Sequence, residues 1–129
     1  MDFSNNGALQ TLKWILGQAP GTPPTVLYVK LHVGDPGADG TANPAVEDTR
    51  QVVSFGAGAN ISTDGRAQAL TDADVLWVAV AGTESYTHMT IWDNITAGAC
   101  WYKGALVAPV AITAGSNFTF PAGSTLDHA

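Results

Sequence analysis

Apolar residues near the start of the chain recur at the spacing of a helix. Leu9, Leu12 and Leu16 lie three and four residues apart, which places them on one helical face, and Ile15 lies beside them. The pattern covers only about ten residues, a length at which a helix is marginal in water by itself. The sequence therefore predicts a short helix that packs either on its own domain or on a neighbouring subunit.

Residues that interrupt helical hydrogen bonding mark both ends of this helix. Asn5 or Asn6 is the expected N-cap, and Gly17 is the expected C-terminal stop. Three prolines within residues 19–25 then exclude a continuing helix and predict a stiff, extended linker. We therefore expect residues 1–25 to form a helical arm and a proline-rich linker that precede a separate domain.

Residues 26–129 change to the period of two that is typical of strands. The predicted strands cover residues 27–33, 50–55, 67–70, 75–80, 86–93, 100–107, 110–113 and 117–120, with a final short strand near the end. Residues 75–80 are almost continuously apolar, which predicts burial on both faces. Residues 114–116 predict a hairpin turn between the two strands beside them. About eight short strands without intervening helices predict an all-β antiparallel sandwich or jelly-roll-like domain.

Strict alternation within residues 86–93 predicts two faces of different character. One face is expected to carry Thr87, Met89 and Ile91, and the other is expected to carry Tyr86, His88, Thr90 and Trp92. Among the aromatic residues of the strands, Tyr28, Trp92 and Tyr102 are candidates for an interface. They fit a buried core equally well, and the pattern leaves both alternatives open.

Composition narrows the classes of partner. The 129 residues fit one domain, and five basic residues face eleven acidic ones, for a formal net charge of -6. Without a basic cluster, binding to nucleic acid or to a membrane surface is not expected. Charged residues make up only 12% of the chain, which favours a protein that keeps part of its surface for protein partners. We expect no secretory leader and no membrane-spanning segment.

Residues that could take part in catalysis or metal binding are few and scattered. Cys100 is a single cysteine inside a predicted strand, which indicates a packed residue and excludes a disulfide within the chain. His32 and His88 lie on the more polar faces of their strands, without the spacing of a metal site or a catalytic motif, and are interpreted as strand-surface or interface residues. We predict no cofactor, no metal and no enzyme, and keep a small hydrolase using either histidine as an alternative.

The acidic loop at residues 34–48 is the one segment that resembles a metal site. Asp35 and Asp39 fit the first and fifth positions of a calcium loop, but Gly37 and Val46 occupy positions that require oxygen ligands. The Asp-Pro-Gly sequence that ends at Gly37 suits a turn instead, with the aspartate accepting from the backbone and the glycine at positive φ. The loop is therefore predicted to be an exposed turn between two strands, in contact with a neighbour or with solvent.

Five motifs in a fixed order carry a family resemblance. They are L-Y-V-x-L-H-x-x-D-P-G at residues 27–37, R-Q-x-V-x-F at 50–55, T-H-x-x-I-[FW]-D at 87–93, G-x-x-W-Y-x-G-A-L at 98–106 and A-G-x-x-F-x-F-P-A-G at 114–123. In this order the chain resembles small virion structural proteins of tailed phages of actinobacteria. Members of that group are described as tail fibre, minor structural or head decoration proteins.

The resemblance implies a non-catalytic component of a virion that is assembled in the host cytoplasm. The expected function is capsid decoration on the outside of the head, and the alternative is a minor tail or tail-fibre subunit that contacts the host surface. Expected partners are the major capsid protein or tail proteins, together with copies of the chain itself, with a trimer favoured. The candidate interface is the predicted helix, through Leu9, Leu12, Trp14, Ile15 and Leu16.

Overall fold

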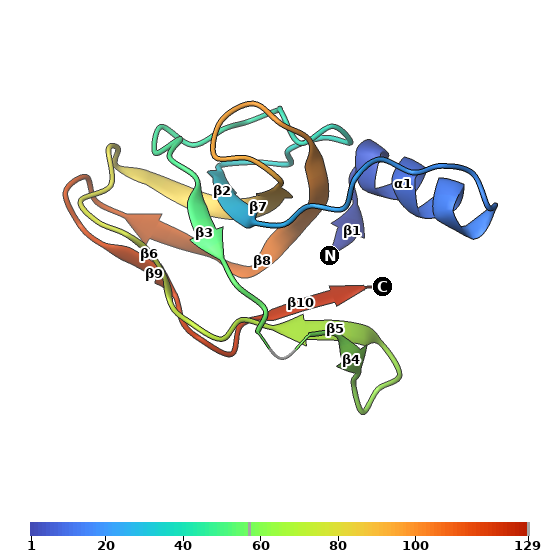
Figure 1. Ribbon diagram of the computed structural model, residues 1–129. Helices are drawn as coiled ribbons and strands as arrows, with labels where there is room; N and C mark the ends of the chain where they lie inside the picture. The colour runs from blue at the N-terminus through green and yellow to red at the C-terminus, as the bar shows by residue number, and fades with distance from the viewer. Residues whose placement is uncertain (57, 129) are drawn as a thin grey trace.

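Antiparallel strands form two layers in the computed structural model, which describes residues 1–56 and 58–128 (Figure 1). The elements in chain order are β1 (Asp2–Phe3), α1 (Asn5–Ile15), β2 (Leu27–His32), β3 (Gln51–Val53), β4 (Asn60–Ile61), β5 (Ala67–Leu70), β6 (Val75–Trp77), β7 (Glu84–Trp92), β8 (Cys100–Ile112), β9 (Phe118–Phe120) and β10 (Thr125–His128). One layer is a five-stranded sheet in the order β1-β8-β7-β2-β3. The other consists of two smaller sheets, β10-β5-β4 and β6-β9. This arrangement confirms the predicted all-β sandwich.

The hydrophobic core lies between the five-stranded sheet and the β6–β9 pair. Val29, Leu31 and Ile91 point inward from β2 and β7, and each is at most 2% exposed. From the opposite layer, Trp77 meets Phe118 at a ring-centroid distance of 5.7 Å. Burying each of these large side chains contributes about 1.5–3 kcal/mol relative to exposure. The alternating apolar residues of β2 and β7 therefore account for the more regular half of the core.

A bulge between β7 and β8 changes which residues share a face. Tyr86 pairs with Val110 and His88 pairs with Ala105, so residues 106–109 of β8 leave the ladder opposite a single residue of β7. As a result Tyr86 is 0% exposed and packs edge-to-face on Phe118, in the same cluster as Ile91. The strict alternation predicted for residues 86–93, which placed Tyr86 opposite to Ile91, is therefore wrong.

Two further predictions about the strands are wrong, because they took no account of which strands pair and where each strand ends. Residues 110–113 do not pair with residues 117–120, because β8 continues through residue 112 beside β7 while β9 pairs with β6. The predicted hairpin is therefore absent. The apolar run at residues 75–80 is not buried on both faces either: β6 ends at Trp77, and Leu76 remains 43% exposed.

The acidic loop after β2 covers the outer face of the five-stranded sheet. It folds back on β2, since Ala45 N donates to Leu31 O at 3.1 Å. His32 lies beneath it, 0% exposed, with Nδ1 2.9 Å from Ala42 O and Nε2 2.9 Å from Thr90 Oγ1. The expectation of a histidine on the strand surface is therefore wrong for His32, because the loop buries that face.

The turns of this loop follow the prediction. Asp35 Oδ1 accepts a hydrogen bond from Gly37 N at 2.8 Å, and Gly37 has a φ of +74°. Asp39 Oδ1 accepts from Thr41 N at 3.1 Å. Both carboxylates thus stabilise backbone turns, which confirms the turn predicted at Asp35.

Candidate functional site

The root of α1 is fixed to the first residues of β8. Ser4 is the N-cap: its Oγ accepts from Gly7 N at 3.1 Å and donates to Cys100 O. The predicted cap at Asn5 or Asn6 is therefore wrong by one or two positions. Gly17, at a φ of +70°, follows the last turn as predicted.

A close approach between helix and strand explains the glycine in the first turn. A Cβ atom at Gly7 would collide with the carbonyl oxygen of Trp101. Gly7 is also the one buried residue of α1, a helix that the structure describes in full. In addition, Asn5 N donates to Ala38 O at 2.8 Å, which ties the helix to the acidic loop. The direction of α1 is thus set at its first turn.

Polar side chains of α1 face the protein and the linker. Gln10 Oε1 accepts from Gly21 N at 2.6 Å, so the linker returns along this side of the helix. Gln10 Nε2 also donates to Asn6 Oδ1 at 3.3 Å. Gln10, Thr11 and Lys13 are partly buried. This orientation is the reverse of the usual surface helix, which turns its apolar side inward.

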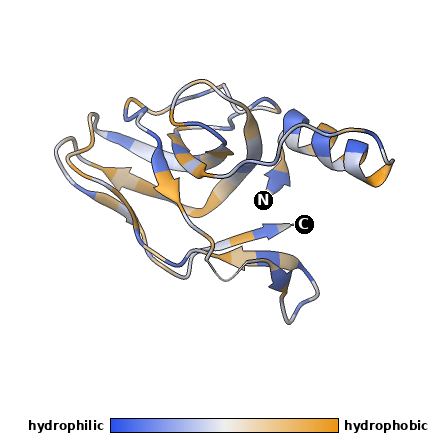
Figure 2. Ribbon diagram, viewed as in Figure 1, coloured by the Kyte–Doolittle hydropathy of each residue, from blue (hydrophilic) through white to orange (hydrophobic). Residues whose placement is uncertain are grey.

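The apolar residues of α1 face solvent. Their exposed fractions are Leu9 49%, Leu12 54%, Trp14 73%, Ile15 69% and Leu16 60%. We call Leu9, Leu12, Ile15 and Leu16, which lie on one side of the helix, the apolar stripe. Figure 2 shows the hydrophobic colour at the free end of α1, and Figure 1 shows that this end points away from the β layers.

This exposure has an energetic consequence. Fully burying one such side chain is worth about 1.5–3 kcal/mol, and roughly half of that area is still in water here. Contiguous apolar surface of this kind marks contact sites on proteins. The five residues predicted as an interface are thus all exposed, although the linker and β8 contact other residues of α1.

The strand aromatics do not form a second exposed surface. Trp92 is only 6% exposed, so the core alternative holds for it. Arg50 lies over its ring at 3.9 Å from the centroid. Tyr102 is partly buried and stacks on Phe3 with centroids 5.0 Å apart. Tyr28 is also partly buried.

Residues that could carry chemistry are engaged in structure. Both ring nitrogens of His32 have partners, and burial lowers its pKa. Cys100 is 4% exposed, which confirms the predicted packed cysteine, and burial raises its pKa to about 11. The described residues contain no group of three or more side chains suited to hold a metal ion. In the same part of the chain, no helix is long and apolar enough to cross a membrane.

A protein-family comparison identifies the family. The model described as podophage GP4 fiber I protein gp80 matches residues 2–126. The chain belongs to this family. No curated protein matches the chain. Family membership makes it a phage structural protein of fibre type, and the matched range includes both α1 and the β layers. This confirms the predicted virion structural protein and fits the tail-fibre alternative at least as well as the expected capsid decoration. The actinobacterial host and the position on the capsid stay predictions.

Proposed function

We propose that this protein is a non-catalytic subunit of a phage fibre and that it assembles through the exposed apolar residues of α1. The observation that carries the proposal is the reversed orientation of this helix. A helix that buries Gln10 against its linker and leaves Leu12 in water is stabilised by a partner that covers Leu12. The fibre family supplies the setting in which such a partner is present.

The use of acidic side chains supports a structural role. Glu47 is 8% exposed, and its Oε2 accepts from Ala81 N at 2.9 Å. Glu84 accepts from the backbone nitrogens of Val46 and Glu47 at 2.9 and 3.1 Å. These carboxylates hold two chain segments together, residues 46–47 and 81–84, and such constraints favour a rigid building block.

A capsid decoration protein is the second candidate. It is favoured by one observation: a short apolar helix rooted on a β domain suits attachment of single copies to a shell of major capsid protein. The fibre candidate is preferred because the family is named for a fibre. A fibre subunit could also contact the host surface, and a trimer suits either candidate.

Labelling of intact virions separates the two candidates. Gold-labelled antibody against the protein is expected on fibres; label spread over the head surface would overturn the fibre assignment and select decoration.

Phage carrying Leu12→Asp should lose the subunit from purified particles, because the introduced charge lies in the proposed contact. Ile61→Asp is the matched control, since Ile61 is 70% exposed on β4 and outside α1. Normal incorporation of Leu12→Asp would refute assembly through α1.

A further inference from the structure

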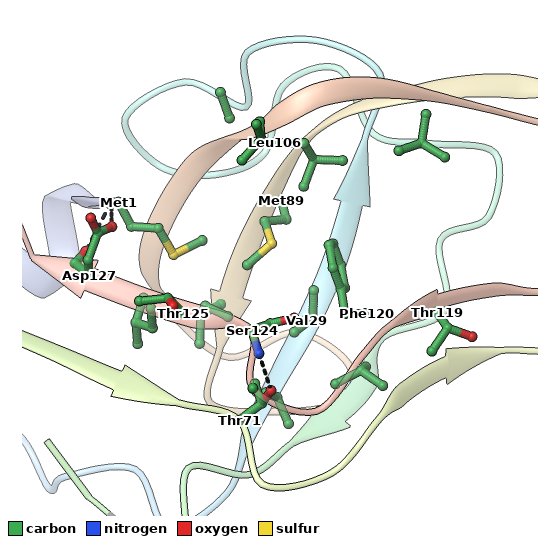
Figure 3. A pocket seen from close by; sticks show the side chains of 18 of the residues that line it. Met1, Val29, Thr71, Met89, Leu106, Thr119, Phe120, Ser124, Thr125 and Asp127 are labelled. Carbon is green, nitrogen blue, oxygen red and sulfur yellow. Dashed lines mark hydrogen bonds and ion pairs between the residues drawn. The ribbon is translucent and has the colours of Figure 1, made fainter.

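The two faces of the five-stranded sheet are closed in different ways. Val29 of β2 and Met89 of β7 point inward and line a cavity of about 750 Å³ between the layers (Figure 3). Side chains alternate along a strand, so His32 of β2 and Thr90 of β7 point to the outer face. The acidic loop lies over that face, and His32 and Thr90 are both 0% exposed. A buried titratable side chain thus lies directly beneath a loop.

Hydrogen bonds fix the positions of the protons around His32. An indole nitrogen can only donate, so Trp92 Nε1 donates to Thr90 Oγ1 at 2.7 Å. A carbonyl oxygen can only accept, so His32 Nδ1 donates to Ala42 O at 2.9 Å. The neutral ring then has no proton on Nε2, which accepts from Thr90 Oγ1 at 2.9 Å. One chain of donors therefore runs from Trp92 through Thr90 and His32 to the carbonyl of Ala42 in the acidic loop.

This chain of donors has no place for a second proton on His32. The proton would occupy Nε2, so the hydroxyl of Thr90 would have to accept from that nitrogen instead of donating to it. Its hydrogen would then have no acceptor among the described residues, and a buried donor without a partner is costly. Burial also disfavours the charged form of the ring itself. A protonated His32 is therefore unfavourable under the closed loop.

The surroundings of His32 act mainly against a proton. Burial lowers its pKa most, and Lys30 and His88 lower it further, whereas the hydrogen bond to Ala42 O has the opposite effect. The titratable and charged groups on the elements packed around it are Lys30 on β2, His88 on β7, Asp35 and Asp39 in the acidic loop, Cys100 and Lys103 on β8, and Arg50 over Trp92.

The two carboxylates of the loop do not compensate for the charge. Asp35 and Asp39 accept hydrogen bonds from the backbone of their own turns, and Asp35 Oδ1 also lies 3.9 Å from Lys103 Nζ. Both ring nitrogens of His32 contact other groups. Among the described residues, no carboxylate therefore pairs with His32 when it gains a proton.

The segment of the loop that contacts His32 also holds the root of α1. Asn5 N donates to Ala38 O at 2.8 Å, four residues before Ala42. Between these two contacts, Gly40 lies so close to Cys100 that a Cβ atom would collide with it. Movement of this segment away from the sheet would therefore break the hydrogen bond between the loop and α1.

Residues 35–43 can open without unfolding the strand beneath them. Val33 N donates to Asn43 O at 3.0 Å and Ala45 N donates to Leu31 O at 3.1 Å, so the base of the loop is anchored at both ends. Asn43 has a φ of +49°, a left-handed conformation that is strained for a residue other than glycine. Opening of the segment can release that strain.

We propose that proton uptake by His32 releases residues 35–43 of the acidic loop from the outer face of the sheet and detaches them from the root of α1. Above pH 6.5, His32 is neutral in both states and the closed loop is favoured. As the pH falls below 6.5, only the open form takes up the proton, so the equilibrium shifts toward it by up to tenfold per pH unit. The switch operates within a single subunit, so it goes beyond the proposed function and does not depend on which partner covers α1.

Hydrogen exchange of single amides, followed by NMR between about pH 7.5 and about pH 5, tests the switch in the full chain. Ala42 N and Asn5 N report on the loop, and Val80 N in the opposite layer reports on global unfolding. Below pH 6.5 the protection of Ala42 and Asn5, corrected for the intrinsic exchange rate, should fall by up to tenfold per pH unit. Local opening exposes little surface, so their exchange should hardly change in dilute urea, whereas that of Val80 should rise steeply.

Two variants identify the proton acceptor. His32→Gln cannot take up a proton and should remove the pH dependence of loop exchange. His88→Gln is the matched control, because His88 is the register partner of His32 on β7, and it should retain the pH dependence. In wild type near neutral pH, the imidazole nitrogen shifts of His32 should show the proton on Nδ1.

Four results would overturn the proposal. They are loop amides that keep their protection down to about pH 5, loop amides that share the urea dependence of Val80 at every pH, an unchanged pH dependence in His32→Gln, and a neutral His32 with its proton on Nε2. The measurements on wild type decide the outcome even where His32→Gln does not fold.

Discussion

Arg50 holds the turn between β7 and β8 in place, and its replacement should destabilise the protein. Its Nη1 donates to the carbonyl oxygens of Asn94 and Ala97 at 2.7 and 2.6 Å. The guanidinium also lies 3.9 Å from the ring centroid of Trp92. The perturbations are Arg50→Lys, which keeps the charge, and Arg50→Ala, which removes the whole side chain.

The magnitude follows from what each variant loses. A hydrogen bond from a charged donor contributes about 1.5–3 kcal/mol, but the two carbonyls belong to exposed residues and regain water, which lowers the cost. Lysine has one nitrogen and cannot hold both carbonyls in the same geometry. We expect Arg50→Lys to lower the free energy of unfolding by about 1–2 kcal/mol. Arg50→Ala also loses the contact with Trp92, so about 2–3 kcal/mol is expected.

Urea unfolding followed by tryptophan fluorescence measures these changes. Arg66→Lys and Arg66→Ala are the matched controls, because Arg66 pairs with Asp127 at 3.2 Å but its side chain is 54% exposed. Such surface pairs contribute about 0–1 kcal/mol. If Arg50→Lys unfolded at the same urea concentration as wild type, the two carbonyl contacts would not contribute as argued. Equal effects at Arg50 and Arg66 would refute the reasoning as a whole.

Three further predictions concern buried groups. Burial lowers the pKa of His32 below 6.5, so the unfolded chain gains a proton at higher pH than the folded protein. The free energy of unfolding should therefore fall as the pH drops below 6.5, by at most about 1.4 kcal/mol per pH unit from this group. Urea titrations at several pH values should show this slope for wild type and not for His32→Gln. Gly40→Ala should destabilise by about 2–3 kcal/mol, because φ is +78° and a Cβ would collide with Cys100. Gly65→Ala, at a φ of +82° with nothing within 4 Å, should cost only the strain of about 1 kcal/mol, and equal thermal shifts would refute the steric part. Cys100 should react with maleimide only as fast as the protein unfolds, because its pKa is about 11 and it is 4% exposed; rapid reaction of folded protein would contradict this.

The parts of the fold that were predictable depend on local pattern. β2 appears where the alternation of Leu27, Val29 and Leu31 indicated it, and β5 follows a turn at residues 62–65. The pairing of β9 with β6 was not predictable, since the two strands are separated by β7 and β8. The bulge in β8 was missed because it depends on the partner strand, and its effect is to turn Tyr86 into the core.

The candidate site, too, was predictable only where it depends on local sequence. The period of Leu9, Leu12 and Leu16 was sufficient to identify the apolar side of the helix. Which way that side faces depends on contacts that are distant in sequence, chiefly Gly7 against Trp101. The cavity of about 750 Å³ between the layers was missed entirely, because its lining comes from Met1 and from segments as far apart in sequence as β2, β3, β6, β7, β8, β9 and β10. One available signal was the uncharged run at residues 104–112, where the edge of β8 opposite to β7 pairs with no strand among the described residues.

The distribution of charge connects these observations. Three of the five basic residues make polar contacts within the chain: Arg50 holds a turn, Arg66 pairs with Asp127, and Lys103 Nζ lies 3.9 Å from Asp35 Oδ1 of the acidic loop. The apolar stripe, by contrast, contains no charged side chain. Polar contacts thus shape the subunit, whereas apolar area remains available for its neighbours. Since hydrophobic contact is not directional, the fixed root of α1 would give the proposed assembly a defined geometry.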